Sequence, residues 1–183
     1  MADPRIEIDD QLTLRAWQPE DAPQLFALVT ANRGHLAAWF DWVDGYTSID
    51  FPRRFVELAR AAYVDGTGLD LALTLNGELA GAAGFGRLDR RGGCGELGYW
   101  LAKSHQGRGL MTQACDALLG HASRELGLSH FVIRAATENT RSRAVAERLG
   151  FALLALRARA EPPARARSGD EAFYVLSRSS TRA

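Results

Sequence analysis

Apolar residues along this chain of 183 residues recur at two spacings, and the spacing changes from segment to segment. Alternation of apolar and polar residues predicts strands, and apolar residues three or four positions apart predict helices. Strands are expected at residues 12–17, 69–75, 78–87, 94–102, 131–135, 151–157 and 173–176. Helices are expected at residues 19–29, 49–66, 111–126 and 139–149, with a short helical or irregular segment at 32–44.

Local signals at the ends of these segments support the assignment. Asn76-Gly77, between two of the strands, is a strong two-residue hairpin signal because both residues accept a positive φ. Pro19-Glu20-Asp21 suits the first turn of a helix, with proline at the first helical position. Gly150 follows the last helix, where glycine commonly ends helices.

The order of elements predicts an α/β (α+β) fold with a mixed sheet of about seven strands flanked by helices. The length allows one sizeable core, so residues 1–183 are expected to form a single domain. The segment 157–169 is rich in arginine, proline and alanine, and we interpret it as a solvated loop rather than a linker between domains.

The amino-acid composition indicates the class of protein and limits its partners. An apolar content of 46% and a charged content of 24% are typical of a soluble globular protein. Basic and acidic residues are equal at 22 each, so no overall field favours nucleic acid or membrane as a partner. The acidic N-terminus has no signal-peptide pattern. Two cysteines in a core of this size need no disulfide, so a reducing cytoplasm is expected. Neither the cysteines (Cys94 and Cys115) nor the four histidines have metal-type spacing, so no metal is expected.

The strand at 94–102 leads through a turn containing Gly107 and Gly109 into an amphipathic helix. The first amides of a helix have no partner within it, and the positive end of the helix dipole attracts anions. Glycine has no side chain to obstruct a phosphate near the backbone. The turn therefore predicts a pyrophosphate site.

Three kinds of turn compete for this pattern. A P-loop needs lysine after its glycines, but Lys103, the only lysine of the chain, precedes them. A dinucleotide fingerprint needs glycine or alanine where Thr112 stands. An ordinary turn between a strand and a helix remains open as the alternative to a phosphate site.

The segment Gln106-Gly107-Arg108-Gly109-Leu110-Met111 resembles the coenzyme A turn of the GNAT acetyltransferases, Gln/Arg-x-x-Gly-x-Gly/Ala. Met111 departs from it, since a small residue is usual there. Residues 96–101 and 139–151 resemble the neighbouring strand and the pantetheine segment of the same family, and the element order matches its fold. Residues 12–15, the segment 32–39 and Thr112 resemble its RimJ/RimL branch.

The resemblance implies a mostly antiparallel mixed sheet and acetyl-CoA as cosubstrate. It implies a primary amine as acceptor, because named members of the branch acetylate the N-terminal α-amines of ribosomal proteins. It implies these residues as coenzyme contacts: Trp100, Leu101, Gln106, Gly107, Arg108, Gly109, Leu110, Met111, Thr112 and Asn139. Arg141 and Arg143 would also lie near the phosphates.

Glu96 is the candidate general base. A carboxylate between apolar residues of a strand is unusual unless it is paired or functional. Alternation places it on one face with Gly98 and Trp100, where glycine leaves space. The family also has a catalytic glutamate on this strand. A structural salt bridge remains the alternative.

Ser142 is the candidate general acid. Many GNAT enzymes use a tyrosine at the position that Ala146 occupies here, so that role is vacant. Helical spacing places Ser142 on the apolar face with Val145 and Leu149. A hydrogen bond from Ser142 to its own helix is the alternative. Asn139 is expected to cap this helix.

Other functions remain open. An acceptor that is a small amine, such as an antibiotic, a polyamine or an amino acid, is the alternative substrate. A non-catalytic acyl-CoA-binding module is the alternative from another class. The aromatic residues of segment 39–42 could form a wall of the acceptor site or belong to the core. The edge strands at the C-terminal end leave a homodimer open.

Overall fold

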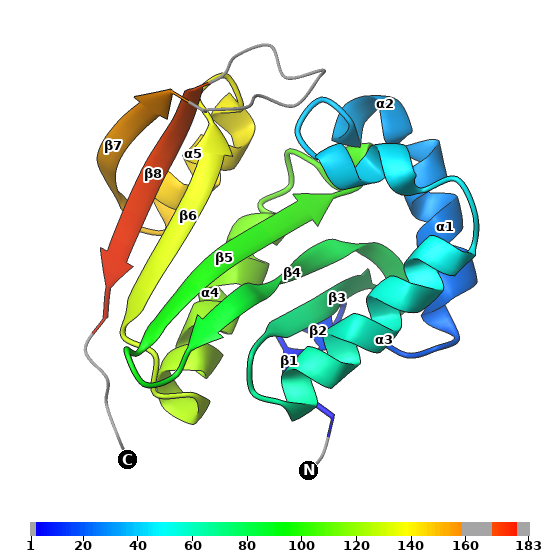
Figure 1. The fold of residues 1–183 in the computed structure, drawn as a ribbon, viewed down its shortest axis with the longest axis horizontal. Helices are drawn as coiled ribbons and strands as arrows, with labels where there is room; N and C mark the ends of the chain where they lie inside the picture. The colour runs from blue at the N-terminus through cyan, green and yellow to red at the C-terminus, as the bar shows by residue number, and fades with distance from the viewer. Residues whose placement is uncertain (1–2, 159–169, 179–183) are drawn as a thin grey trace.

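The computed structural model describes residues 3–158 and 170–178, which form one eight-stranded sheet with helices on both faces (Figure 1). The sheet order is β1-β2-β3-β4-β5-β6-β8-β7, and every pair is antiparallel except β5 with β6. The strands are β1 (Arg5–Glu7), β2 (Leu12–Ala16), β3 (Leu69–Leu75), β4 (Glu78–Asp89), β5 (Cys94–Leu101), β6 (His130–Ala136), β7 (Ala152–Ala158) and β8 (Asp170–Ser177).

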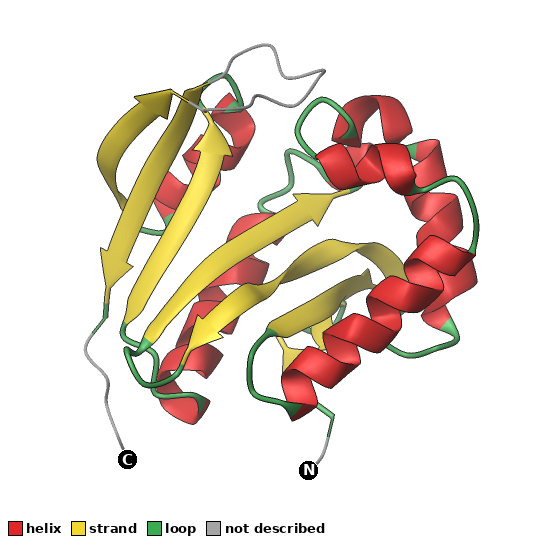
Figure 2. Cartoon of the chain, viewed as in Figure 1, coloured by secondary structure: helices red, strands yellow, loops and turns green. Residues whose placement is uncertain are grey.

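Helices α4 (Leu110–Glu125) and α5 (Thr140–Arg148) lie behind the sheet in Figure 2, and the remaining helices lie on the other side. Those are α1 (Asp21–Ala31), α2 (Arg33–Leu36) and α3 (Asp50–Val64), with the 3-10 turns η1 (Asp41–Gly45) and η2 (Lys103–His105). Among the described residues, no helix has the length and apolar content needed to cross a bilayer.

Two hydrophobic cores follow from the alternation along the strands. Leu71 and Leu97 face α4 and belong to the larger core, which the buried residues of α4 complete. Ala72 faces the other way and joins a smaller core with Trp17 of the β2 end and Val56 of α3. Each face of the sheet is therefore covered by its own set of helices.

The predicted mixed sheet and its hairpin are confirmed. Asn76 and Gly77 have φ values of 51° and 83°, the positive values that a two-residue hairpin between β3 and β4 requires. Gly150, with a φ of 83°, follows α5 as expected. The short helical segment at 32–44 consists of α2 and η1.

Two details differ from the prediction. The sheet has one strand more, because the three-residue β1 is too short to show a period. Helix α1 begins at Asp21, so Pro19 precedes the helix instead of starting it. The Asp21 carboxylate accepts the amide of Gln18 at 2.7 Å and pairs with Arg15 at 2.6 Å, which fixes the start of the helix. The expected loop falls mostly on 159–169, outside the described residues.

Strand β7 lies at one edge of the sheet and exposes apolar side chains. Leu153, Leu154 and Leu156 on this strand are among the large hydrophobic residues that remain exposed. An edge strand with apolar side chains is a common site of association. The homodimer stays a prediction.

Strands β5 and β6 pair over only three residues, from Cys94↔His130 to Glu96↔Val132. Beyond this point β5 continues along β4 as far as Leu101, and β6 continues along β8 as far as Ala136. Because each strand follows a different partner, the two separate like the arms of a V (Figure 1). The site described below lies where they separate.

One carboxylate of the sheet, that of Asp70, is partly buried. Asp70 on β3 accepts a hydrogen bond from the Trp17 indole at 3.0 Å. Burial raises the pKa of Asp70 to about 6, and the Trp17 bond offsets only part of this effect. Burial and the Asp70 charge together raise the pKa of Tyr46 to about 12.

The Asp70 carboxyl predicts a fall of stability with rising pH. The folded protein keeps this proton up to about pH 6, whereas the unfolded chain loses it near its ordinary value of 3.8. The free energy of unfolding should therefore fall by roughly 2–3 kcal/mol between about pH 4 and pH 7 because of this group. Asp70→Asn should remove that fall and be the more stable protein above about pH 6. Urea unfolding of both proteins across this range measures the difference, and Asp65→Asn, an exposed carboxylate, serves as control. Parallel profiles for wild type and Asp70→Asn would contradict the prediction.

Candidate active site

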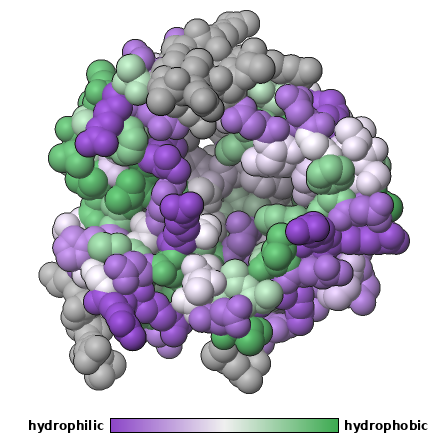
Figure 3. Space-filling view, in the orientation of Figure 1, coloured by the Kyte–Doolittle hydropathy of each residue, from purple (hydrophilic) through white to green (hydrophobic). Residues whose placement is uncertain are grey.

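A cleft of about 1030 Å³ opens where β5 and β6 separate. Its walls come from the end of β5, the turn before α4, the first turns of α4 and α5, and the α2 region. The space-filling view shows the molecule hollowed near its centre, between the two parts of the sheet (Figure 3). Its volume is at the upper end of the range typical of small-molecule sites.

The glycine turn forms one end of this cleft. Gly107 and Gly109 have φ values of 77° and 76°, which side chains rarely adopt. Among the described residues, a Cβ at Gly107 would meet nothing within 4 Å, and one at Gly109 would meet only the Gln113 side chain, at 3.6 Å. Gly109 is the N-cap of α4, so the amides that follow it have no partner within the helix. The turn leaves open space in front of a helix N-terminus, which suits a phosphate group.

The structure brings together most of the predicted site residues. Those that line the cleft are Trp100, Leu101, Gln106, Gly107, Gly109, Leu110, Met111, Thr112, Asn139 and Ser142. Arg108 is exposed beside the turn, and neither it nor Glu96 belongs to the lining. Met111, the departure from the family motif, is 7% exposed and packs in the larger core beneath α4.

Glu96 lies on β5 at the last pair that this strand makes with β6. Its carboxylate accepts the Arg134 side chain at 2.7 Å, and Glu171 of β8 approaches the same guanidinium at 4.0 Å. The face is open here, because a Cβ at Gly98 would meet no atom within 4 Å. This geometry fits a carboxylate held beside the cleft by an ion pair, and it also fits a structural salt bridge.

Ser142 and Tyr99 are joined across the cleft. The Ser142 hydroxyl donates to the Tyr99 hydroxyl oxygen at 3.2 Å, and the Tyr99 hydroxyl donates to the main-chain carbonyl of Ser142 at 2.9 Å. Burial is the main cause that raises the pKa of Tyr99, so its hydroxyl keeps its proton at neutral pH. The sequence motifs did not single out the Tyr99 side chain. The alternation that places Tyr99 on the face opposite Glu96 was the signal for its side chain.

Asn139 is the N-cap of α5, as predicted. Its side-chain oxygen accepts the amide of Ser142 at 3.2 Å, which fixes the first turn of the helix. Since Asn139 also lines the cleft, the cap and the candidate acid lie on the same wall.

Gln106 links two walls of the cleft, a role that the sequence did not reveal. Its amide oxygen accepts Arg141 of α5 at 2.5 Å, and its amide nitrogen lies 2.6 Å from His35 Nε2 on α2. The amide nitrogen can only donate, so His35 Nε2 acts as an acceptor here. Burial lowers the pKa of His35, which favours this neutral form.

Of the remaining candidate cations and nucleophiles, few reach the cleft. Arg143 turns away from it, because its guanidinium donates to the Tyr174 hydroxyl and the Thr137 carbonyl, both at 2.9 Å. Cys115 is buried, and burial raises the pKa of its thiol. Neither Cys115 nor Cys94 lines the cleft. A cysteine nucleophile therefore has no place among the residues of this site.

Aromatic residues between α2 and α3 form another wall of the cleft. Trp39 and Phe40 line the cleft, and Trp42 lies beside Trp100 of β5 with ring centroids 6.2 Å apart. Trp42 is 39% exposed, so this segment is not simply part of the core.

Residues 11–152 match the family described as the acetyltransferase (GNAT) domain. The chain belongs to this family of N-acetyltransferases. The putative ribosomal N-acetyltransferase YdaF of Bacillus subtilis is 35% identical over 146 residues, 79% of this chain and 80% of that protein. The ribosomal-protein-serine acetyltransferase of Escherichia coli is 30% identical over 148 residues, 81% of this chain and 83% of that protein.

Solved structures of GNAT enzymes share the whole fold. RimL, a ribosomal α-N-protein acetyltransferase determined in complex with coenzyme A, has a TM-score of 0.90 and 29% identity. The match covers 95% of this GNAT chain and 98% of RimL. The predicted resemblance to the RimJ/RimL branch is therefore confirmed at the level of sequence and fold.

Proposed function

We propose that this protein transfers the acetyl group of acetyl-CoA to the N-terminal α-amine of a ribosomal protein. The observation that carries the proposal is the cleft at the separation of β5 and β6, with the glycine turn at one end. The names of the relatives support the acceptor, since they are described as ribosomal-protein acetyltransferases. Such an acceptor implies a cytoplasmic enzyme.

The position of the glycine turn favours one direction for the coenzyme in the cleft. Its pyrophosphate would accept the amides from Gly107 to Thr112, where open space and the helix N-terminus favour an anion. Arg141 and Arg108 would add positive charge on this side. The pantetheine arm would then run between the strands, toward Asn139 and the amides of Trp100 and Leu101. These amides would stabilise the negative charge that develops on the thioester oxygen.

The transfer is a direct attack in a ternary complex. The neutral amine forms a bond to the thioester carbon, and the carbon–sulfur bond then breaks. An α-amine has a pKa near 8, so a base that removes its proton is useful at neutral pH. Glu96 is our candidate base, acting directly or through water. Its place beside Gly98 on an open face supports this role, and Arg134 holds the carboxylate in position.

The departing thiolate takes a proton from an acid, and Ser142 is our candidate. Its hydroxyl lies on the cleft wall and is oriented by Tyr99. In this role the Ser142 hydroxyl would turn from Tyr99 to the sulfur and give its proton to the thiolate, and water in the open cleft would return a proton to the serine oxygen. Ala146, at the position where many GNAT enzymes have tyrosine, is fully buried and has no group to offer.

Release of coenzyme A thiol tests the function. The protein should release thiol from acetyl-CoA with peptides that begin like ribosomal proteins, and mass spectrometry should find the acetyl group on the α-amine. Thiol release with polyamines or antibiotics alone would support the small-amine alternative. Binding of acetyl-CoA without thiol release for any amine would support the non-catalytic alternative and overturn the proposal.

Gly109→Val should weaken acetyl-CoA binding by at least about tenfold, because the side chain would enter the space proposed for the pyrophosphate. Isothermal titration with acetyl-CoA measures the change. Gly127→Val is a matched control, since Gly127 also has a positive φ, 69°, and lies after α4, away from the cleft. Both variants should lose similar stability, but only Gly109→Val should lose affinity. Equal affinities in both would remove the turn from the coenzyme site.

Substitutions of the two candidate catalytic residues should differ in pH dependence. Glu96→Gln should lower kcat by roughly 10²- to 10⁴-fold at about pH 6 to 7, and less as the pH approaches the amine pKa. Ser142→Ala should lower the chemical step at all these pH values, because it affects the leaving thiolate. Coenzyme affinity should change little in either variant. Initial rates against pH for each protein measure both effects.

Two controls match these variants. Glu171→Gln removes the other carboxylate near Arg134, which lies on β8 and not on β5. Ser123→Ala removes a hydroxyl of α4 that has no hydrogen-bond partner in the described part of the chain. Both should keep nearly full activity. If Glu96→Gln keeps full activity at about pH 6 to 7 and unfolds more easily, Glu96 is a structural partner of Arg134.

A further inference from the structure

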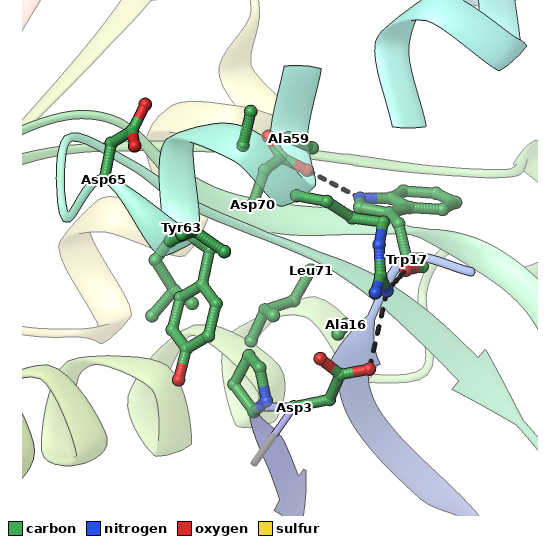
Figure 4. A pocket seen from close by; sticks show the side chains of 13 residues that line it. Asp3, Ala16, Trp17, Ala59, Tyr63, Asp65, Asp70 and Leu71 are labelled. Atoms are coloured by element: carbon green, nitrogen blue, oxygen red, sulfur yellow. Dashed lines mark hydrogen bonds and ion pairs between the residues drawn. The ribbon is translucent and has the colours of Figure 1, made fainter. Parts of the chain in front are cut away.

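A second cavity, of about 290 Å³, lies between the C-terminal half of α3, the end of β2 and the start of β3 (Figure 4). It shares no lining residue with the cleft. Most of its wall is apolar and includes Ala59, Val64 and Leu71. The volume is close to the lower end of the range for small-molecule sites.

Asp70 of β3 is one of the charged residues that line this cavity. Figure 4 shows the Asp70 carboxyl directed toward the Trp17 indole, which donates to Asp70 Oδ1 at 3.0 Å. Trp17 is 1% exposed and packs edge-on against Phe55 at 5.4 Å, so the donor is fixed. Within residues 3–158 and 170–178, Trp17 is the only hydrogen-bond partner of this side chain. The second oxygen, Oδ2, is therefore available to a ligand.

The nearby cation is engaged elsewhere. Arg60 lines the same cavity, but its guanidinium donates to the Trp17 carbonyl at 2.7 Å and to the Gln18 side chain at 3.4 Å, and it pairs with Asp3 at 3.4 Å. Of the residues that the structure describes, none therefore gives Asp70 a cationic partner inside the cavity.

We propose that this cavity binds a primary ammonium group carried on a short aliphatic body. The ammonium group donates to Asp70 Oδ2, and the aliphatic body contacts Ala59, Val64 and Leu71. A carboxylate among apolar walls loses much of its hydration, and a cation with N–H donors restores both charge and hydrogen bonds. A neutral molecule of the same shape gains only from burial of its apolar surface. The site is separate from acetyl transfer and does not depend on the proposed function.

Isothermal titration without acetyl-CoA tests the proposal, with n-butylammonium as probe and n-butanol as its neutral match. At about pH 7.5, where Asp70 is ionised, n-butylammonium should bind saturably and n-butanol at least about tenfold more weakly. Asp70→Asn should weaken n-butylammonium binding by a similar factor and leave n-butanol unchanged, while Asp65→Asn at the rim should change it little. Equal affinity for the two probes, unchanged binding in Asp70→Asn, or no saturable binding would overturn the proposal.

A second variant locates the ligand. Ala59→Leu should fill the cavity from α3 and abolish n-butylammonium binding although Asp70 is intact. Circular dichroism of each variant checks the fold, and Asp70→Asn is expected to be the more stable protein at this pH. Unchanged binding in Ala59→Leu would mean that the amine binds elsewhere, for instance in the cleft as an acceptor, and would also overturn the proposal.

Discussion

The parallel pairing of β5 with β6 ends after Glu96 and Val132, and the whole cleft depends on this early end. Each strand pairs over a longer stretch with its other neighbour. Strand β5 pairs with β4 as far as Leu101, and β6 pairs with β8 as far as Ala136. Parallel pairs are slightly less stable per residue than antiparallel pairs, so the parallel seam is where separation costs least. The separation frees backbone amides and creates volume at the same place. A substrate can therefore form hydrogen bonds with backbone groups that are left unpaired where β5 and β6 separate.

The larger core joins the two parts of the sheet on the face that α4 and α5 cover. It contains Leu97 of β5 and Ile133 of β6, together with Leu118 of α4 and Ala146 of α5. Both apolar and polar side chains line the cleft, and some of the polar ones connect its walls. Gln106 bonds to both His35 and Arg141, and Tyr99 bonds to Ser142. The walls are rigid elements joined by hydrogen bonds, which suits a site that must keep its geometry.

The spacing of apolar residues and the turn residues predicted the sheet well. Apolar and polar residues alternate in a strand that buries one face, and the hairpin between β3 and β4 needs the positive φ values of Asn76 and Gly77. They missed β1, whose three residues are too few to alternate. In the site, motif and spacing placed the glycine turn and the Asn139 cap. They could not place the partner of Glu96, because Arg134 reaches it through a register between strands far apart in sequence. For the same reason the environment of Asp70 appeared only in three dimensions.

The bond from the Tyr99 hydroxyl to residue 142 ends on a main-chain carbonyl, which every amino acid possesses. The brace between β5 and α5 is therefore independent of the side chain at that position. The side-chain oxygen of Asn139 likewise accepts the main-chain amide of residue 142, so both hydrogen bonds involve the backbone of that residue. Position 142 can exchange its side chain while the frame around it stays, and a fold with this arrangement can change its chemistry without rebuilding its scaffold.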